Sequence, residues 1–363
     1  MAKDNNKKGP IRKILRVILG IVIALLALFV IFVVVVTIFE YRPDDVEVIE
    51  LTGTSSKTLA QGDSLTVLTW NTGYGALGES ADFFMDGGTM VYSADKAGVM
   101  NNLEAIADEI DKVNPDVVFL QEVDCVAART YSINEVSFFE DRFQDRVSSY
   151  ALNIDALFIP YPIPPIGRLK CGVQTLSRFD ITSSTRVSLP VPFKWPASTC
   201  NFKKCVDVSR VPIEGTDSEL VLVNLHLEAY DSGEGKIAQT NMLKEILQTE
   251  VDAGNYVIAG GDFNQEFSNV DTSDYPVYDG LWAPGVIDVE EFGSDLVFIT
   301  DSSVPTCRSL DKVYLGADTD TFQYYVIDGY IVSSNLTIDS CVNQDLDFVN
   351  SDHNPLLLTV TLQ

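Results

Sequence analysis

The chain of 363 residues contains only two histidines, and both lie among acidic and amide side chains. His226 comes two residues after Asn224, and His353 directly follows Asp352. An imidazole ring changes its charge near neutral pH, so it can accept or donate a proton during a reaction. A protein of this length usually scatters several more histidines over its surface. The restriction of imidazole to these two motifs indicates a hydrolytic site.

Other acids and amides stand where predicted strands end. The alternating segment 65–70 runs up to Asn71, and the apolar run 117–120 is followed by Gln121 and Glu122. The same position, at or just past the C-terminal end of a predicted strand, is shared by His226, Asp262, Asn264, Asp328, Asp352 and His353. Because strand ends meet at one rim of a packed pair of sheets, we expect these side chains to share one pocket.

Helices and strands follow one another irregularly along the chain. Apolar residues recur at helical spacing over 99–113 and stop at Asn114 and Pro115, and a second helix fits 236–251. Further strands are predicted at 220–227, 256–259, 324–327 and 356–362. The order is too irregular for a barrel of eight repeats and favours two packed sheets with helices outside.

Seven motifs occur in the order that is typical of the endonuclease/exonuclease/phosphatase superfamily, which the sequence resembles. This superfamily of metal-dependent phosphoesterases includes pancreatic-type deoxyribonucleases, sphingomyelinases and inositol polyphosphate 5-phosphatases. The motifs are residues 70–71, 121–122, 171–178, 224–226, 261–264, 327–328 and 351–353. Each motif alone would be weak, but together they cover nearly all of the chain after residue 65. The resemblance implies an α/β fold, a four-layered α/β sandwich of two packed mixed β-sheets flanked by helices.

The resemblance also implies a divalent metal site. Asn71, Glu122 and Asp352 would supply amide and carboxylate oxygens to Mg²⁺ or Mn²⁺, which are the ligands that such hard cations prefer. The ion would polarise a phosphoryl oxygen and stabilise the charge that develops there. Phosphoester hydrolysis needs mainly positioning and charge neutralisation from a protein.

Catalytic roles follow from the same resemblance. Asp262 would orient or deprotonate the attacking water, and Asn264 would donate a hydrogen bond to the phosphorus centre. His353, paired with Asp328, would act on the phosphate as a proton donor or an imidazolium, and His226 would donate to a non-bridging or leaving oxygen. Whether Asp262 or His353 is the general base stays open, although we favour Asp262 for the water.

Each of these residues also has a purely structural explanation. Asp262 and Asn264 could shape a turn after two glycines, Glu122 could be a solvated strand end, and His226 could be a buried core histidine. These structural explanations would all have to apply at once to residues that also match the order of the motifs. The chain could also be a family member that has lost its activity.

Two residues are candidates for substrate binding. Tyr74 lies in the glycine-rich insertion 73–88, and Arg178 ends the motif 171–178. Apurinic-site endonucleases of the superfamily usually carry asparagine where His226 stands, so abasic repair is disfavoured.

Two loops could add substrate preference. The proline-stiffened loop 159–167 either packs against the sheet edge or forms a wall for a lipid or sugar group. The aromatic and basic stretch 193–196, near Lys203 and Lys204, could contact a headgroup or the bilayer.

An uncharged apolar segment precedes the motifs. Residues 17–39 contain 23 residues without a charge, and a helix of that length spans roughly 34 Å, enough to cross a bilayer. The alternative is a cleaved signal peptide, but the segment is longer than is usual and lacks a small-residue cleavage site. Six basic residues precede the segment, which places the N-terminus in the cytoplasm. We therefore expect a basic cytoplasmic tail at 1–16, a transmembrane anchor at 17–39, a juxtamembrane linker at 40–64 and an extracytoplasmic catalytic domain at 65–363.

The remainder of the chain is strongly acidic. Residues 41–363 hold 19 basic and 50 acidic side chains, a formal net charge of −31. Such a surface repels polyanions, and binding of a long duplex normally needs a basic face. The sequence therefore favours a small or lipid-linked phosphoester as substrate over nucleic acid. A deoxyribonuclease-like enzyme is the first alternative, and an inactive surface binding protein on the same fold is the second.

Six cysteines lie in the predicted extracytoplasmic part, where disulfides are permitted. Cys200 and Cys205 could close a small loop. The spacings lack the pairs of a structural zinc site. Pairing stays open for Cys125, Cys171, Cys200, Cys205, Cys307 and Cys341, as does the oligomeric state.

Overall fold

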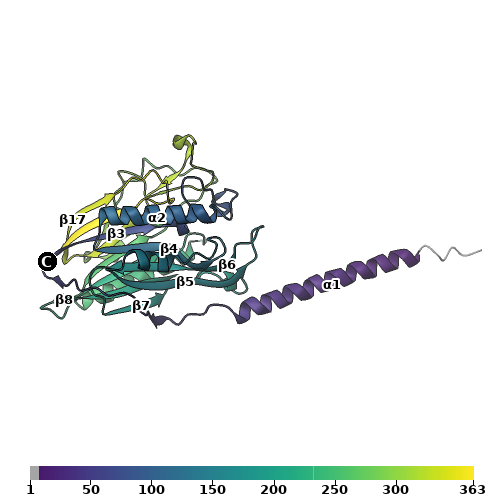
Figure 1. Ribbon diagram of the computed structural model, residues 1–363, viewed down its shortest axis with the longest axis horizontal. Helices are drawn as coiled ribbons and strands as arrows, with labels where there is room; N and C mark the ends of the chain where they lie inside the picture. Colours follow the sequence, from purple (N-terminus) through teal and green to yellow (C-terminus); the bar gives the residue numbers. More distant parts are fainter. Residues whose placement is uncertain (1–7, 232) are drawn as a thin grey trace, which may run out of the picture.

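The first element of the chain is a long apolar helix. The computed structural model describes residues 8–231 and 233–363, and α1 (Lys8–Ile38) projects away from the folded domain (Figure 1). Within α1, Ile11–Ile38 is long and apolar enough to cross a membrane.

The helix starts earlier than the predicted span 17–39. Lys8, Arg12, Lys13 and Arg16, which precede this span, belong to the same helix, because lysine and arginine are good helix formers. Residues 1–7 of the predicted basic tail lie outside the described residues.

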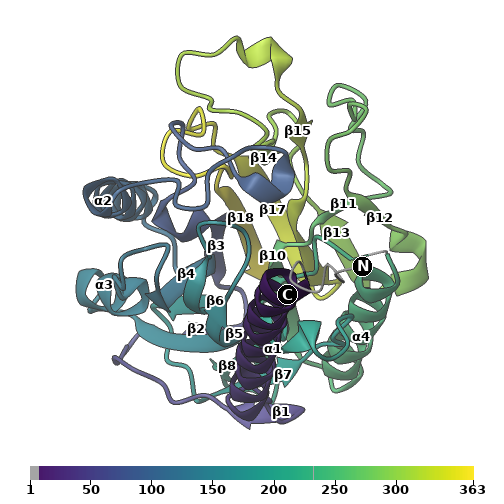
Figure 2. The same cartoon turned by 90° about the vertical axis from the view of Figure 1, so that its right-hand side faces the viewer.

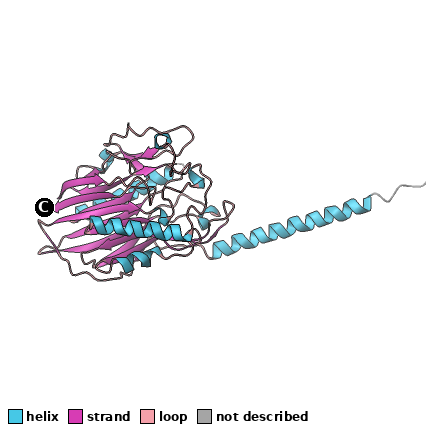
Figure 3. Cartoon of the chain, turned by 45° about the horizontal axis from the view of Figure 1, so that its top comes forward, coloured by secondary structure: helices cyan, strands magenta, loops and turns pink. Residues whose placement is uncertain are grey.

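Two mixed β-sheets, both within the described residues, form the centre of the domain (Figure 3). The six-stranded sheet has the order β17-β18-β3-β4-β6-β5. Its strands are β3 (Ser64–Asn71), β4 (Val117–Ala127), β5 (Val147–Ile159), β6 (Gly167–Ser177), β17 (Leu336–Asn343) and β18 (Leu356–Leu362).

The eight-stranded sheet has the order β1-β7-β8-β9-β10-β16-β13, with β2 beside β8. Its strands are β1 (Val46–Val48), β2 (Leu59–Ala60), β7 (Ser183–Ser188), β8 (Cys205–Glu214), β9 (Glu219–His226), β10 (Tyr256–Asp262), β13 (Leu296–Ile299) and β16 (Asp328–Ser333). β9 and β10 are parallel neighbours. Every residue of β10 is buried, which fits its continuous apolar run.

The core lies between the two sheets. Apolar side chains of both sheets, among them Phe119, Ile258 and Leu358, form one buried cluster. Tyr330 crosses this layer from β16, and its hydroxyl donates to the backbone oxygens of Val67 and Leu356 at 2.7 and 2.8 Å. Its buried polar group is therefore satisfied while its ring fills the core.

Helices cover the outer faces, which completes the four-layered α/β sandwich that the sequence predicted. α2 (Lys96–Val113) packs on the six-stranded sheet together with α3 (Glu135–Arg142), and α4 (Glu234–Asp252) packs on the eight-stranded sheet. Figure 2 shows α2 and α3 on one side of the strands and α4 on the other, with α1 directed toward the viewer.

The two helices predicted at 99–113 and 236–251 are confirmed with slightly wider bounds. Asp95 caps the N-terminus of α2 by accepting a hydrogen bond from the backbone N–H of Gly98. Asn114 ends α2 in a left-handed conformation directly before a proline.

Short elements connect these layers. Two small two-stranded sheets are formed by β11 (Gln265–Phe267) with β12 (Gly285–Ile287), and by β14 (Cys307–Arg308) with β15 (Tyr324–Tyr325). The short 3₁₀ helices are η1 (Gly73–Gly75), η2 (Phe84–Asp86), η3 (Ala197–Cys200), η4 (Val289–Phe292) and η5 (Thr319–Thr321).

The segment 40–64 is not the free linker that its polar composition suggested. β1 pairs with β7 and β2 pairs with β8, so the segment adds to the eight-stranded sheet. Leu59 is fully buried in the core between the sheets. Its polar residues misled the prediction because they belong to an edge strand and to turns at the surface.

Two further expectations differ from the structure. Only the first half of the strand predicted at 324–327 is a strand, because β15 ends at Tyr325. The longer strand β16 begins at Asp328. All six cysteines lie within the described residues and are free, so the loop between Cys200 and Cys205 is not closed by a disulfide.

Candidate active site

One row of polar residues crosses the eight-stranded sheet at its rim. His226 is the last residue of β9 and Asp262 the last of β10, and the two are direct partners in the parallel pairing. Asp262 is also the partner of Asp328 in the antiparallel pairing with β16. Strand register therefore sets these three side chains next to one another.

Asp328 reaches this rim by a route that the sequence did not predict. We expected it at the C-terminal end of a strand, but it is the first residue of β16. Because β16 runs antiparallel to β10, its beginning lies at the rim where β10 ends.

The six-stranded sheet supplies the facing residues. Asn71 ends β3, and Glu122 lies within β4 at an irregularity of the pairing with β6, where its φ is 57°. This bulge turns the Glu122 side chain toward the cavity while the strand continues to residue 127.

The loop before β18 brings the last two residues of the site. Ser351 donates its hydroxyl to the backbone oxygen of Asn71 at 2.7 Å, and the Trp70 indole donates to the backbone oxygen of His353 at 2.9 Å. A Cβ on Gly73 would lie 2.9 Å from Oδ1 of Asp352, and Gly73 has a φ of +52°. The close approach of η1 to Asp352 therefore requires glycine.

Asn71, Glu122, Asp262 and the two histidines form one connected set of contacts. Asn71 Nδ2 lies 3.0 Å from Asp262 Oδ2 and 3.5 Å from Glu122 Oε1. His226 Nε2 lies 3.5 Å from Asp262 Oδ2 and 4.0 Å from Glu122 Oε1. His353 Nε2 lies 3.7 Å from Asp262 Oδ2. The structure thus brings together groups from both sheets around Asp262.

The two histidines have opposite electrostatic surroundings. Burial disfavours a charge on His353, but the Asp328 carboxylate, 2.8 Å from Nδ1, and the Cys307 thiol outweigh burial and raise the pKa of His353 well above its usual value. Burial lowers the pKa of His226 well below its usual value, and the positive charges of Lys204 and His353 lower it further. His353 is therefore held as a cation and His226 as a neutral ring.

Burial raises the pKa values of two acids of the site. Burial raises the pKa of Asp262 to about 6, opposed by the charge of His353 and assisted by that of Asp328. Burial also raises the pKa of Asp352 to about 7, opposed by His353 and assisted by Glu122. Each carboxylate lacks enough positive charge around it, which is the situation that a bound cation relieves.

Asn264 directly follows the rim. Its φ is 52°, its backbone N–H donates to Asp262 Oδ1 at 2.8 Å, and its Nδ2 donates to the backbone oxygen of Leu227 at 3.0 Å. The turn that these bonds stabilise fixes the orientation of the Asp262 carboxylate. This structural role coexists with the lining of the cavity by Asn264.

The donor set fits a hard divalent cation better than a soft one. Among the described residues, the tightest donor clusters are Asp262–Asp328–His353 and Cys307–Asp352–His353, whose ligand atoms lie within 4.8 Å of one another. His353 and Asp328 already bind each other, and burial raises the pKa of Cys307 to about 12, which keeps its thiol protonated. The open donors are therefore carboxylate oxygens, above all those of Asp352 and the nearby Glu122.

Asn71 is oriented differently from what a metal ligand would need. Its Nδ2 faces Asp262 and Glu122, and its Oδ1 accepts the backbone N–H of Gly73 at 3.0 Å. In this arrangement Asn71 donates hydrogen bonds to the acids, and carboxylate oxygens remain available as donors to a cation.

A cavity of about 690 Å³ opens onto the site. Six of the eight predicted catalytic and metal residues line it. These six are Glu122, His226, Asp262, Asn264, Asp352 and His353. The other two, Asn71 and Asp328, lie directly behind it through their contacts with Asp262 and His353.

The two predicted substrate-binding residues have different positions. Tyr74 lines the cavity, and Cζ of the Arg129 guanidinium lies over the Tyr74 ring, 3.4 Å from the ring centroid. The buried hydroxyl of Tyr74 has no hydrogen-bond partner among the described residues. Arg178 lies elsewhere and binds Asp145 and Asn114. It follows the end of β6, which runs antiparallel to β4, so that end lies at the opposite rim. Its predicted contact with substrate at this site is wrong.

Several residues that line the cavity were not predicted as site residues from the sequence. Lys204 is buried in the cavity wall, where burial lowers its pKa and the acids Glu228 and Glu122 oppose this shift. Burial raises the pKa of Asp86 to about 6, although the Tyr230 hydroxyl donates to it at 3.0 Å. The sequence suggested substrate binding for the insertion 73–88 and a headgroup or bilayer contact near Lys203 and Lys204, and the contact of both segments with the site depends on tertiary structure.

Comparisons with known proteins agree with this geometry. A model of the Endonuclease/Exonuclease/phosphatase family matches residues 68–353. Comparison with curated proteins gave no match.

Solved structures with a similar fold include an endonuclease/exonuclease/phosphatase from Beutenbergia cavernae DSM 12333, which is 17% identical with a TM-score of 0.55 over 82% of this chain and 72% of that chain. An endonuclease/exonuclease/phosphatase family protein from Bacteroides thetaiotaomicron is 16% identical with a TM-score of 0.54, over 84% of this chain and 97% of that chain. A humanised D. rerio TDP2 is 15% identical with a TM-score of 0.50, over 82% and 99% respectively. These likenesses show a shared fold.

Proposed function

The chain belongs to the endonuclease/exonuclease/phosphatase family, and from this premise we propose that it is a membrane-anchored, extracytoplasmic, metal-dependent phosphoester hydrolase. The observation that carries the proposal is the convergence of Glu122, Asp262, Asp352 and His353 on one cavity from both sheets. An inactive binding protein on this fold would have no need to keep all of these groups around one cavity.

Glu122 and Asp352 would hold Mg²⁺ or Mn²⁺, and Asn71 would join them only after its amide rotates to present oxygen. When bound, such an ion polarises a phosphoryl oxygen and stabilises the charge that develops on it. The buried, partly protonated state of Asp352 supports this assignment, because it marks a place where negative charge lacks a partner.

Asp262 would orient and deprotonate the attacking water. Its carboxylate is fixed by Asn71 and by the backbone N–H of Asn264, and its pKa of about 6 leaves it deprotonated at neutral pH. A base whose pKa lies close to the working pH transfers protons efficiently.

His353 and His226 would act on the phosphate from two sides. The imidazolium of His353, held by Asp328, would stabilise a non-bridging oxygen or protonate the leaving group. Neutral His226 would donate one hydrogen bond without adding positive charge that would compete with the ion. Asn264 would contribute a further amide donor.

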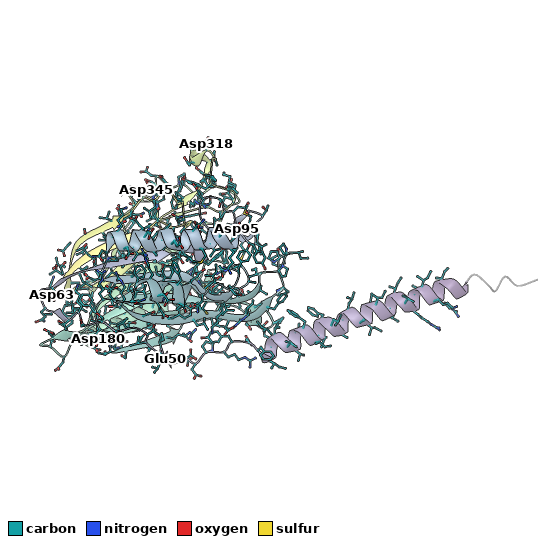
Figure 4. All side chains as sticks on the ribbon, viewed as in Figure 1. Glu50, Asp63, Asp95, Asp180, Asp318 and Asp345 are labelled. Atoms are coloured by element: carbon teal, nitrogen blue, oxygen red, sulfur yellow. The ribbon has the colours of Figure 1, made fainter. Side chains whose placement is uncertain are left out.

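A small or lipid-linked phosphoester is favoured as substrate over a polynucleotide. The acidic side chains Glu50, Asp63, Asp95, Asp180, Asp318 and Asp345 are exposed in different parts of the domain (Figure 4). With a net charge of −31 on residues 41–363, long-range attraction of a polyanion is absent. A nuclease is the alternative that the assay below distinguishes.

Anchoring is supported by α1 and its contacts with the domain. The Trp195 indole donates to Thr37 Oγ1 at 3.0 Å, and Ser198 Oγ donates to Glu40 Oε1 at 2.9 Å. A helix that the domain holds by specific contacts fits a retained anchor better than a cleaved signal peptide. The basic residues before the apolar span 17–39 favour a cytoplasmic N-terminus.

The test uses the full-length chain in dodecyl maltoside micelles, with Mg²⁺ or with a chelator. The substrates are bis-p-nitrophenyl phosphate, p-nitrophenyl phosphate, sphingomyelin, phosphoinositides and plasmid DNA. We expect metal-dependent turnover of at least one small or lipid phosphoester. Absence of turnover of every substrate in the presence of Mg²⁺ would favour the inactive binding protein, and efficient DNA cleavage would favour the nuclease.

A further inference from the structure

The cavity extends well beyond the catalytic groups and reaches the apolar helix. Phe29, Phe32, Val33 and Val36 of α1 line it together with the site residues. Their spacing of three, one and three positions puts all four on one face of the helix. One face of the proposed anchor is therefore a wall of the cavity that contains the catalytic residues.

Specific contacts hold this wall in place. The Phe32 and Phe158 rings meet edge to face with centroids 6.3 Å apart, and Val36 is buried. Lys203 Nζ donates to Glu40 Oε1 at 3.3 Å, just after the end of α1. The helix thus enters the domain through defined packing and hydrogen bonds, so its distance from the catalytic end of the cavity is fixed.

The opposite wall is apolar as well. One part of it is the loop between β5 and β6, where the sequence suggested an apolar wall at 159–167. The other part is the segment that leads to β8. The residues are Ile159, Pro160, Tyr161, Ile166, Phe193 and Phe202. Polar groups gather at the other end, where Lys204, Glu122 and His226 lie. The cavity is therefore amphiphilic, with an apolar section beside α1 and a charged section at the catalytic groups.

The surface around the apolar section also exposes large apolar side chains. Large apolar side chains stand out near α1, and Ile163, Tyr161 and Trp195 are 94%, 70% and 61% exposed. Phe29 lies 11 positions before Glu40, which is about 16 Å along the helix axis. If Glu40 lies at the membrane surface, the lining face of α1 reaches into the hydrocarbon of the nearer leaflet. Exposed aromatic side chains next to a membrane helix are typical of such an interface.

We propose that this cavity binds a lipid phosphoester directly from the membrane, with an alkyl or acyl chain along the Phe29–Val36 face of α1. The phosphoester then lies at Glu122, Asp262 and His353. This inference rests on the proposed phosphoester hydrolysis and specifies its substrate class. The occupant is an acyl chain because the apolar section opens at a membrane-crossing helix and continues without interruption to the catalytic groups.

The experiment measures hydrolysis of p-nitrophenyl alkyl phosphates whose alkyl group ranges from methyl to dodecyl, so that the bond that breaks stays the same. The full-length chain is assayed in dodecyl maltoside micelles, which contain no competing phosphoester. The test variant is Val33→Trp, which fills the apolar section. The matched control is Val34→Trp, on the next residue of α1, which is 49% exposed and does not line the cavity.

The readout is the ratio of kcat/KM for the dodecyl ester to that for the methyl ester. In the wild type and in Val34→Trp we expect this ratio to be at least about 30, because each buried methylene adds to binding. In Val33→Trp the ratio should fall by about tenfold or more. Equal ratios in the two tryptophan variants, with the methyl ester still hydrolysed, would overturn the lipid inference and leave the hydrolase proposal standing.

A second readout does not depend on turnover. A dodecyl phosphodiester with a diazirine at the chain end is photolysed in the presence of the Asp262→Asn protein, and the labelled peptides are identified by mass spectrometry. We expect labelling of residues 29–36 of α1. Labelling confined to other parts of the protein would contradict the inference, whether or not the wild type hydrolyses any ester of the series.

Discussion

At the scale of single residues, the site shows how two side chains of the same type acquire different tasks. The Asp328 carboxylate, 2.8 Å from His353, raises the pKa of this ring against the effect of burial. Burial lowers the pKa of His226, and the charges of Lys204 and His353 lower it further, although Asp262 Oδ2 lies 3.5 Å away. Asp262 lies between the two rings. One charged ring, one neutral ring and one carboxylate give separate groups for the phosphate and for the water.

The first prediction concerns these groups. Asp262→Asn and His353→Ala should each lower kcat by about 10³-fold, because each removes a proton-transfer or charge-stabilising group. The measurement is hydrolysis of bis-p-nitrophenyl phosphate, with circular dichroism to verify folding. Arg178→Ala, at the opposite rim, serves as the control and should keep kcat within about twofold. Near-normal rates in the two site variants would contradict the assigned roles.

The second prediction concerns metal binding and pH. Without metal, the folded protein keeps protons on Asp352 and Asp262 up to their pKa values of about 7 and about 6, whereas an unfolded carboxyl releases its proton near pH 4. Because these folded pKa values are raised, the contribution of both acids to stability falls as the pH rises through them. A divalent cation binds the deprotonated acids and restores this loss.

We therefore expect Mg²⁺ to raise the melting temperature more at pH 8 than at pH 6, by about 3 °C or more. Thermal unfolding with and without a chelator measures this difference. Asp352→Asn should abolish most of the increase, and Asp318→Asn, on an exposed loop, should leave it intact. An equal effect of Mg²⁺ at both pH values would contradict Asp352 as a ligand.

At the scale of elements, strand direction decides which residues meet. Asp328 joins the site because β16 begins at the rim where β10 ends, and Arg178 misses it because β6 ends at the other rim. The bulge at Glu122 allows a residue inside β4 to point into the cavity. The segment 40–64 extends the eight-stranded sheet and links α1 to the domain over a short path.

The third prediction tests whether the segment 40–64 is part of the fold. Leu59 is fully buried between the sheets, so Leu59→Ala should destabilise the protein by about 2–5 kcal/mol. Val48 in the same segment is 84% exposed, and Val48→Ala should change stability by less than about 0.5 kcal/mol. Urea unfolding of both variants measures the difference. A neutral Leu59→Ala would show that the segment is a free linker after all.

At the scale of the whole molecule, an acidic domain and an apolar helix share one cavity. The domain surface carries its acids in many directions (Figure 4), and the cavity opens beside α1. The acidic surface disfavours polyanions. If α1 crosses a membrane as proposed, its position favours molecules that reside there. Both features select against long nucleic acids for different physical reasons.

The fourth prediction follows from the net charge. At physiological salt and with Mg²⁺, the full-length chain should leave plasmid DNA intact under conditions in which it hydrolyses bis-p-nitrophenyl phosphate. Agarose electrophoresis and release of p-nitrophenol measure the two reactions in parallel. The Debye length shortens from about 8 Å at physiological salt to about 3 Å at about 1 M, so added salt should weaken the repulsion and increase any residual DNA cleavage. Plasmid nicking at a comparable rate would overturn the substrate preference.

The sequence by itself determined the layers of the fold, the apolar helix and most of the site. Local patterns carry this information, because strand alternation, helical stripes and the residues at strand ends depend on near neighbours. Asp262, His226 and Glu122 were therefore identified without coordinates. Tertiary structure alone decided the rest. The entry of Asp328 from the beginning of a strand, the exclusion of Arg178, the strands within 40–64 and the wall that α1 gives to the cavity all depend on contacts between distant segments, which no local pattern encodes.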